Sequence, residues 1–368
     1  MDGFVNPEFS IDKDCSVHNI NPLANLFSPY STITGIEHHK SENQNFFVDQ
    51  YYGLVYDDWI RQGGAFYGIT SKMPDFTLDD KANLGFLRIP FVKIPRIFVK
   101  NRQQVDLLVS ELKSKYKSYQ FYYRGQTKEY FLNRSETTLQ NLYGDGTTLE
   151  PSLLPSSYRA KININDVMPE WCGLLKFSLD VYAGKDSGLR SKFFRWITSY
   201  EFVQFAFATA QHYGLPSNGL DVTGNFDIAE FFASRESHWL DQDHLMSYKL
   251  KGNWEKPSVI YVYGVKNQYD KIDFQNINFG ELFKSRPSFQ DAYFMYKGWG
   301  MNLNDNARNI IAAVYFDENY ITSGLTPQSL FPDFDTDNFG RILFLTLKEK
   351  QFEFENLMEY YKNFYWVV

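Results

Sequence analysis

Apolar segments with the composition of β-strands lie far apart in the chain. They are short, rich in aromatic or β-branched residues, and cover 118–126, 258–265, 309–316 and 341–347. Such runs favour strands. Two other segments, 102–117 and 188–213, repeat apolar residues at helical spacing. Strands and helices in this order predict an α+β fold, with helices packed on a mixed sheet, over residues 96–368.

Other residues of this region indicate how its helices begin and where further helices lie. Asn101 is a candidate N-cap residue for the helix over 102–117. Additional helices are predicted over 226–236 and 348–364. Residues 1–95 have no clean helical or strand period. We predict an irregular, aromatic-rich accessory region there, which packs on the main domain because its rings need burial.

The composition is that of a globular protein with unusually many rings. Hydrophobic residues make up 43% and charged residues 22% of the 368 residues, which disfavours disorder. Aromatic residues reach 18%. Aromatic rings fill cores and also line sites where flat ligands stack. The formal net charge of −7 argues against a protein that coats nucleic acid or an anionic membrane.

Cysteine content and hydropathy bear on the compartment. The two cysteines, Cys15 and Cys172, are too few for a disulfide framework and fit a reducing environment. No window approaches ~18 consecutive apolar residues, and the first residues lack the pattern of a signal peptide. We therefore expect a cytoplasmic protein with no membrane partner.

The stretch 211–223, QHYGLPSNGLDVT, carries more polar groups than a connection needs. Gly214 and Pro216 suffice to end the preceding helix. A neutral imidazole at His212 near the Asp221 carboxylate is suited to act as a general base with an orienting group. In the other interpretation, Asp221 caps the helix that follows and His212 packs beneath it. Both interpretations stay open for His212, and capping is favoured for Asp221.

A second polar group follows the aromatic strand over 118–126. The guanidinium of Arg124 offers a planar fork to phosphate or carboxylate, and Gly125 lets a ligand come close. The alternative is a structural arginine paired with an acidic neighbour.

Four motifs occur in a fixed order along the chain. They are YYRGQ (122–126), LEPSLLP (149–155), QHYGLPSNGLDVT followed by IAEFFA (211–233), and RPSFQDAYF (286–294). Together they resemble the FRG domain family, named for a Phe-Arg-Gly motif and found in bacterial toxin, phage-defence and mobile-element settings. The resemblance covers roughly half of the chain. The sequence departs from the family pattern at Tyr123, at Asn218 and Gly219, and at Val222.

The resemblance implies a nucleotide-binding effector with a distant likeness to ADP-ribosyltransferases. It would bind a nucleotide or dinucleotide, with NAD as the candidate cofactor, and transfer ADP-ribose or cleave NAD. The implied catalytic residues are Arg124, His212, Asp221 and Gln290. The implied cofactor-binding residues are Tyr123, Gly125, Gln126, Gln211, Tyr213 and Thr223.

If the chain binds such a ligand, each of these residues has a role in binding. The rings of Tyr123 and Tyr213 would stack on a base. A helix that begins near Asn225 or Phe226 would direct backbone N–H groups at an anion. The uncharged Gln290 would orient a ribose hydroxyl, although a glutamine on a helix surface is the simpler interpretation.

An alternative is a binding module without chemistry that recognises a phage or host protein or a nucleic acid. The departures at Asn218, Gly219 and Val222 favour it. The basic, aromatic stretch 93–128 would suit a single strand, but it is better explained as a solvated helix face. The His and Asp residues of 238–244 have no spacing typical of a metal site, so no metal is predicted.

Overall fold

The computed structural model describes most of the chain from residue 83 onward and short parts of the amino-terminal region. The described residues are 36–40, 45–49, 51–52, 54–57, 83–89, 92–160, 164–217, 219–240, 244–251, 257–265, 271–273, 285–295, 303–317, 319–320 and 322–367. The predictions made for 238–244, for 1–95 and for Asn218 therefore lie partly or wholly outside the described residues.

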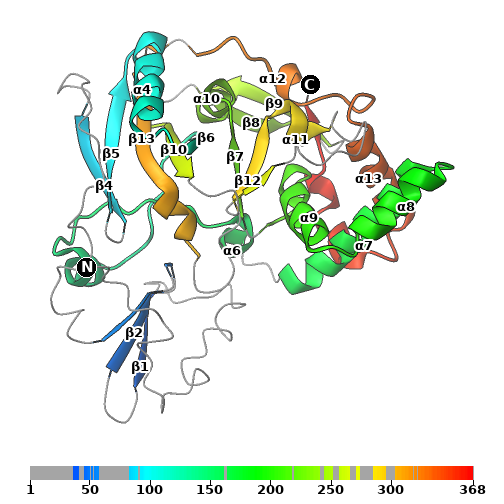
Figure 1. The fold of residues 1–368 in the computed structure, drawn as a ribbon, viewed down its shortest axis with the longest axis horizontal. Coiled ribbons are helices and arrows are strands. Elements are labelled where there is room, and N and C mark those ends of the chain that lie inside the picture. Colours follow the sequence, from blue (N-terminus) through cyan, green and yellow to red (C-terminus); the bar gives the residue numbers. More distant parts are fainter. Residues whose placement is uncertain are drawn as a thin grey trace.

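An eight-stranded mixed sheet forms the centre of the molecule (Figure 1). Its strands, in spatial order, are β11 (Lys271–Asp273), β12 (Ala292–Met295), β7 (Leu220–Thr223), β6 (Gln120–Gln126), β10 (Val259–Val265), β13 (Ile310–Phe316), β5 (Val92–Val99) and β4 (Asn83–Ile89). β13 and β5 are parallel, and the other neighbours are antiparallel. The general prediction of an α+β fold with a mixed sheet is confirmed.

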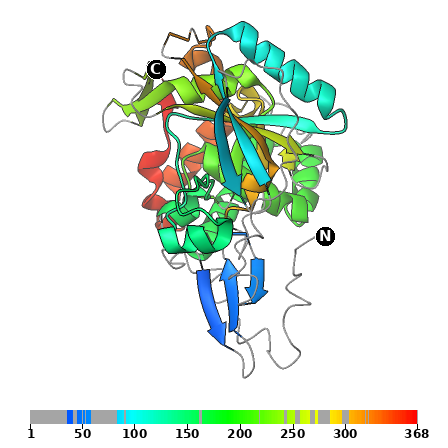
Figure 2. The same ribbon diagram turned by 90° about the vertical axis from the view of Figure 1, so that its left-hand side faces the viewer.

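Two smaller sheets accompany the central one. β1 (Ile36–Lys40), β2 (Asn45–Asp49) and β3 (Leu54–Asp57) form an antiparallel sheet that lies beside the main body (Figure 2). β8 (Arg235–Trp239), β9 (Leu245–Leu250) and β14 (Trp366–Val367) form the other, in which β9 is central. The predicted boundary after residue 95 falls inside β5, so β4 and the start of β5 belong to the main sheet.

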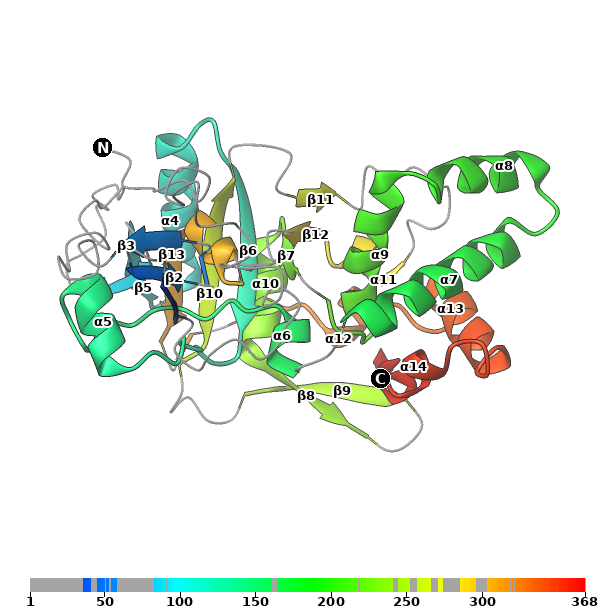
Figure 3. The same ribbon diagram turned by 90° about the horizontal axis from the view of Figure 1, so that it is seen from below.

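Helices pack on both faces of the sheet and also build a separate lobe. They are α4 (Arg102–Lys115), α5 (Glu136–Tyr143), α6 (Ser156–Ala160), α7 (Ile164–Ala183), α8 (Ser187–Trp196), α9 (Tyr200–His212), α10 (Phe226–Ser234), α11 (Arg286–Phe289), α12 (Pro327–Leu330), α13 (Asn338–Glu349) and α14 (Glu355–Met358), with 3₁₀ turns η5 (Asp305–Asn309) and η6 (Tyr361–Asn363). Figure 3 shows the lobe of α7, α8, α9, α13 and α14 beside the sheet.

Strand alternation divides the core into layers. On one face, Tyr123, Ile260 and Val314 pack against α4 and α10. On the other face, Tyr122 and Tyr261 pack with the segment around α5. Successive side chains of a strand point to opposite faces, so Arg124 lies on the same face as Tyr122. A third core, centred on helices α7, α9 and α13, fills the lobe.

Two predicted elements are wrong for identifiable reasons. The helix predicted over 188–213 is two helices, because Ser199 accepts a hydrogen bond from the Phe202 N–H and starts α9 anew. The strand predicted over 341–347 is part of α13. Its buried residues include Phe339, Leu343 and Leu347, which recur every four positions, and a short apolar run cannot by itself distinguish a strand from a buried helix.

The carboxyl-terminal helix predicted over 348–364 is also wrong. The chain there forms the short helix α14 and the turn η6.

Two predicted helix ends are confirmed. Asn101 accepts a hydrogen bond from the Gln104 N–H at the start of α4, and Gly214 has the positive φ of 84° typical after a helix end. Of the helices in the described residues, none combines the length and apolarity needed to cross a bilayer.

Candidate functional site

A cavity of about 470 Å³ opens where β6, β7, α6, β8 and the end of α9 meet. Nine of the ten predicted site residues line it: Tyr123, Arg124, Gly125, Gln126, Gln211, His212, Asp221, Thr223 and Gln290. The fold brings them together because β6 and β7 are neighbours, with Tyr123 opposite Thr223. The tight loop after α9 leads directly into β7, so His212 and Asp221 meet across it.

Arg124, Asp221 and His212 form the centre of the cavity. Arg124 Nη1 donates a 2.6 Å hydrogen bond to the backbone oxygen of Asp221. The Asp221 Oδ1 atom lies 3.5 Å from His212 Nε2. No hydrogen bond within the described residues involves Arg124 Nε or Asp221 Oδ1, although both atoms are buried. Among the described residues, Arg124 forms no ion pair with a carboxylate, and its buried Nε–H has no acceptor.

The interpretation of Asp221 as a helix cap is wrong. Asp221 lies within strand β7, and α10 is capped by Asn225, whose side chain accepts from the Asp227 N–H at 2.9 Å. Asn225 therefore caps α10, and Asp221 lines the cavity.

Burial sets the protonation of the central pair. It lowers the pKa of His212, and the Asp221 carboxylate opposes this shift only in part. Burial also raises the pKa of Asp221, with His212 and then Arg124 opposing it, although the side chain keeps 26% of its area exposed. Desolvation disfavours the charged form of each group. His212 is consequently neutral near pH 7 and able to accept a proton.

Gln290 is buried and does not lie on a helix surface. It follows the last residue of α11, and 6% of its area is exposed. Its Nε2 donates to the Leu330 oxygen at 3.3 Å, and a side-chain hydrogen bond joins it to His212. Gln290 therefore lies beside the imidazole and raises the pKa of His212 against the effect of burial.

Three other residues predicted to bind the cofactor also make contacts that stabilise the fold. A Cβ atom on Gly125 would lie 1.8 Å from the Ala229 oxygen, so the glycine admits helix α10 rather than only a ligand. Thr223 Oγ1 accepts a 3.1 Å hydrogen bond from the Asn225 N–H. Gln211 Oε1 accepts one of 2.7 Å from the Ser217 hydroxyl, which holds the loop closed.

Tyr213 does not line the cavity, contrary to its predicted part in binding. Its ring is 2% exposed, and its hydroxyl lies 3.1 Å from both carboxylate oxygens of Asp337. The N-terminus of α10, which was expected to direct backbone N–H groups at an anion, is also not part of the cavity lining. Asp227 in its first turn pairs with Arg102. The residues of α10 that line the cavity are Ala229 and Phe232, which lie further along the helix.

Three arginines that sequence reasoning missed line the cavity. Arg159 extends from α6, and its pKa is lowered by desolvation and then by the charge of Arg124, although part of the residue is exposed. Arg235 begins β8 and lies over the ring of Phe231. Arg286 is 2% exposed and donates to the backbone oxygens of His212 and Tyr365. Arg286 is the first residue of the motif RPSFQDAYF (286–294), so the sequence pointed to this segment but not to the arginine itself.

Aromatic rings form one wall of the cavity. Tyr248 and Phe331 are stacked with centroids 5.0 Å apart, and Phe232 approaches Phe331 edge-on at 6.0 Å. Tyr365 lies 6.1 Å from Phe331 and beneath the Arg286 guanidinium. These rings come from α10, β9 and the carboxyl-terminal segments, and no local pattern predicted that they would meet.

The contacts define an order of groups along the cavity. Arg159 and Arg124 form a cationic end. Asp221, hydrogen-bonded through its backbone to Arg124, and His212 follow at the centre. Arg286 connects His212 to the aromatic wall. The site thus offers positive charge, then a carboxylate and an imidazole, then rings.

Two of the departures from the pattern of the FRG domain, Val222 and Gly219, are accommodated by packing. Val222 is 3% exposed. A Cβ atom on Gly219 would lie 2.3 Å from the Phe294 ring, so strand β12 requires this glycine. In the part of the chain that the structure describes, no three His, Cys, Asp or Glu side chains gather as metal ligands. Comparison with models of protein families, with curated proteins and with solved structures finds no match to this chain.

Proposed function

We propose that this cavity binds a nucleotide or dinucleotide, with NAD as the leading ligand. One observation carries the proposal: Arg124, Gln126 and Asp221 line the cavity, and each holds one buried polar atom (Nε, Oε1 and Oδ1 in turn) that makes no hydrogen bond to any described residue. Buried polar groups nearly always have partners. A phosphate accepts from the guanidinium, and ribose hydroxyls donate to the two oxygens.

The order of groups along the cavity supports the same ligand class. Desolvation and then the charge of Arg124 lower the pKa of Arg159, and the planar fork of arginine suits phosphate. The rings of Tyr248 and Phe331 line the cavity and are the candidates for contact with a nucleobase. A dinucleotide would place its pyrophosphate at the cationic end and one ring system at the aromatic wall.

The central pair can perform a hydrolytic or transfer reaction on NAD. In such a step the bond between ribose and nicotinamide breaks, and nicotinamide leaves with the electron pair. The ribosyl carbon forms a bond to water or to a hydroxyl of a target. Neutral His212 accepts the proton of that nucleophile, and the carboxylate of Asp221 stabilises the positive charge that develops on the sugar. We therefore propose an effector of the FRG type, related in its mechanism to ADP-ribosyltransferases.

Calorimetry with NAD, ADP-ribose and ATP tests the binding. Charge-assisted hydrogen bonds contribute about 1.5–3 kcal/mol, so Arg124→Ala should weaken binding roughly ten- to hundredfold. Arg124→Lys should recover only part of this, because lysine lacks the planar fork. Arg190→Ala is the matched control: Arg190 pairs with Asp180 on the surface of the helical lobe, and its loss should leave affinity unchanged.

Mass spectrometry of the protein with NAD and lysate tests the chemistry. Transfer of ADP-ribose or release of nicotinamide that is lost in His212→Gln supports the proposed reaction. Binding without either product would identify a module that recognises its ligand without turnover. Equal affinity of the wild type and Arg124→Ala for all three compounds would refute the nucleotide site.

A further inference from the structure

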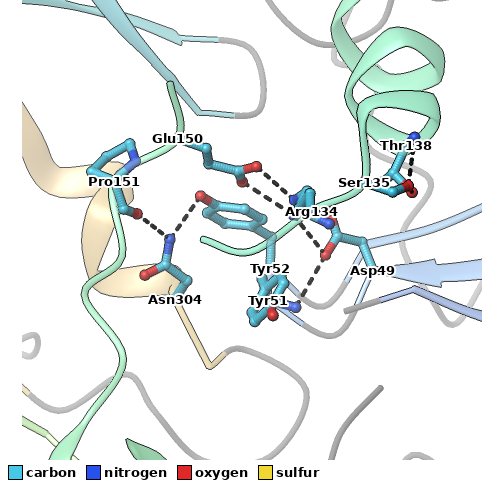
Figure 4. Close-up of polar contacts among 9 residues, drawn as sticks. All are labelled: Asp49, Tyr51, Tyr52, Arg134, Ser135, Thr138, Glu150, Pro151 and Asn304. Atoms are coloured by element: carbon cyan, nitrogen blue, oxygen red, sulfur yellow. Dashed lines mark hydrogen bonds and ion pairs between the residues drawn. The ribbon is translucent and has the colours of Figure 1, made fainter. Parts of the chain in front are cut away.

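A buried ionic cluster fastens the amino-terminal region to the main body (Figure 4). Arg134 Nη2 lies 2.9 Å from Asp49 Oδ2, and its Nε lies 2.6 Å from Glu150 Oε2. The Arg134 guanidinium also covers the ring of Tyr51, 4.7 Å from the centroid. All three charged side chains are buried. Buried ion pairs add little stability over apolar packing but fix one arrangement of the chain.

A second connection runs through Asn304, which is fully buried in the loop before β13. Its backbone N–H donates to the Tyr51 oxygen at 2.7 Å, and its Nδ2 donates to the Tyr52 hydroxyl at 2.8 Å. The same amide donates to the Pro151 oxygen at 2.9 Å and accepts from the Leu153 N–H at 2.7 Å. Figure 4 shows the contacts with Tyr52 and Pro151.

Both connections end on the segment 150–153, which leads directly into α6. Ser152 donates its N–H to the oxygen of Tyr130, a residue of the cavity wall. Within α6, the Ser157 N–H donates to the Ser217 oxygen at 3.1 Å. Arg159, a residue of α6, lines the cavity. The segment 150–160 is thus held at one end by residues 49–52 and at the other by the loop of the site.

We propose that Asp49 and Tyr52 are positioning residues that set the place of Arg159 at the cationic end of the cavity. This inference rests on the proposed function, since its effect is measured on an anionic ligand. Loss of either contact removes one constraint on the segment 150–153, so that α6 no longer holds Arg159 at a single position relative to Arg124. Residues 49–52 therefore act on ligand affinity without lining the cavity.

A double-mutant cycle in the full chain, with ADP-ribose as the calorimetric probe, tests the coupling. Residues that act through a connected network have modest effects on affinity, so Asp49→Asn should weaken binding about three- to tenfold. In an Arg159→Ala background the same change should have no further effect. In an Arg235→Ala background it should keep its full effect, because Arg235 belongs to α10 and β8. Equal effects in the two backgrounds would refute positioning through Arg159.

Tyr52→Phe is the milder variant if Asp49→Asn does not fold. It keeps the ring and removes only the hydroxyl that accepts from Asn304. Hydrogen exchange gives a readout that needs no ligand: the amides of Leu153 and Ser157 should exchange faster in either variant than in Arg190→Ala. Unchanged exchange at both amides overturns the inference. Faster exchange together with no binding of ADP-ribose to the wild type would overturn the nucleotide site alone.

Discussion

Replacing Gly125 by alanine tests whether helix packing, rather than ligand access, requires this glycine. The new Cβ would lie 1.8 Å from the Ala229 oxygen and 2.8 Å from the Ala233 nitrogen. The first distance is about 1.2 Å below the 3.0 Å that real Cβ contacts almost never undercut. Both obstacles are backbone atoms, so no side-chain rotation relieves the contact, and α10 must move away from β6.

The expected loss of stability follows from that displacement. Overpacking in a core costs typically 1–3 kcal/mol, and a clash with the backbone belongs at the upper end, so we expect the free energy of unfolding to fall by about 3 kcal/mol or more. Urea denaturation followed by circular dichroism measures it. The matched control is Gly324→Ala, because Gly324 is exposed with no atom within 4 Å of its added Cβ, and a change within about 0.5 kcal/mol is expected there.

The variant also reports on the cavity. Ala229 and Phe232 of α10 line it, so a displaced helix should weaken ADP-ribose binding at a temperature where the variant is still folded. A Gly125→Ala protein as stable as Gly324→Ala would refute the packing argument. The glycine would then be explained by ligand access alone.

Three further measurements address the corrected assignments. The free energy of unfolding should fall as the pH drops below about 6.5, because the unfolded chain takes up a proton on His212 that burial resists in the folded state; His212→Gln should flatten this slope in denaturation titrations. Asn225→Ala should cost about 1 kcal/mol in urea unfolding, since the Asp227 N–H loses its cap. Tyr213→Phe should cost about 1–3 kcal/mol by leaving Asp337 short of a donor, and its ADP-ribose affinity should equal that of the wild type; weakened binding would contradict the placement of Tyr213 outside the cavity.

Local patterns predicted the elements whose signals are local. The aromatic and β-branched runs of β6, β10 and β13 are strands as expected. The 20-residue helix α7 went unrecognised, and its sequence contains Pro169, which normally interrupts a helical pattern. The apolar run in α13 was assigned to the wrong class because length and period could not separate the two structures.

The site was predictable only where its residues share a motif. Arg124, His212 and Asp221 could be placed together because they stand in motifs of one ordered pattern. Arg159 and the ring of Phe331 belong to segments whose approach depends on the packing of α6 and of the carboxyl-terminal region. Such contacts follow from tertiary structure, and no spacing within a single segment encodes them.

The charge of the whole chain and that of the cavity have opposite signs. The net charge is −7, yet Arg124, Arg159 and Arg235 line the cavity against Asp221 and the exposed Glu236 at its rim. The mutual influence of Arg124 and Arg159 is unfavourable while both stay protonated, as guanidinium groups do in proteins. An anion between them removes this repulsion and attracts both. The negative net charge and the cationic lining of the cavity together support the proposal of a small anionic ligand over that of a long nucleic acid.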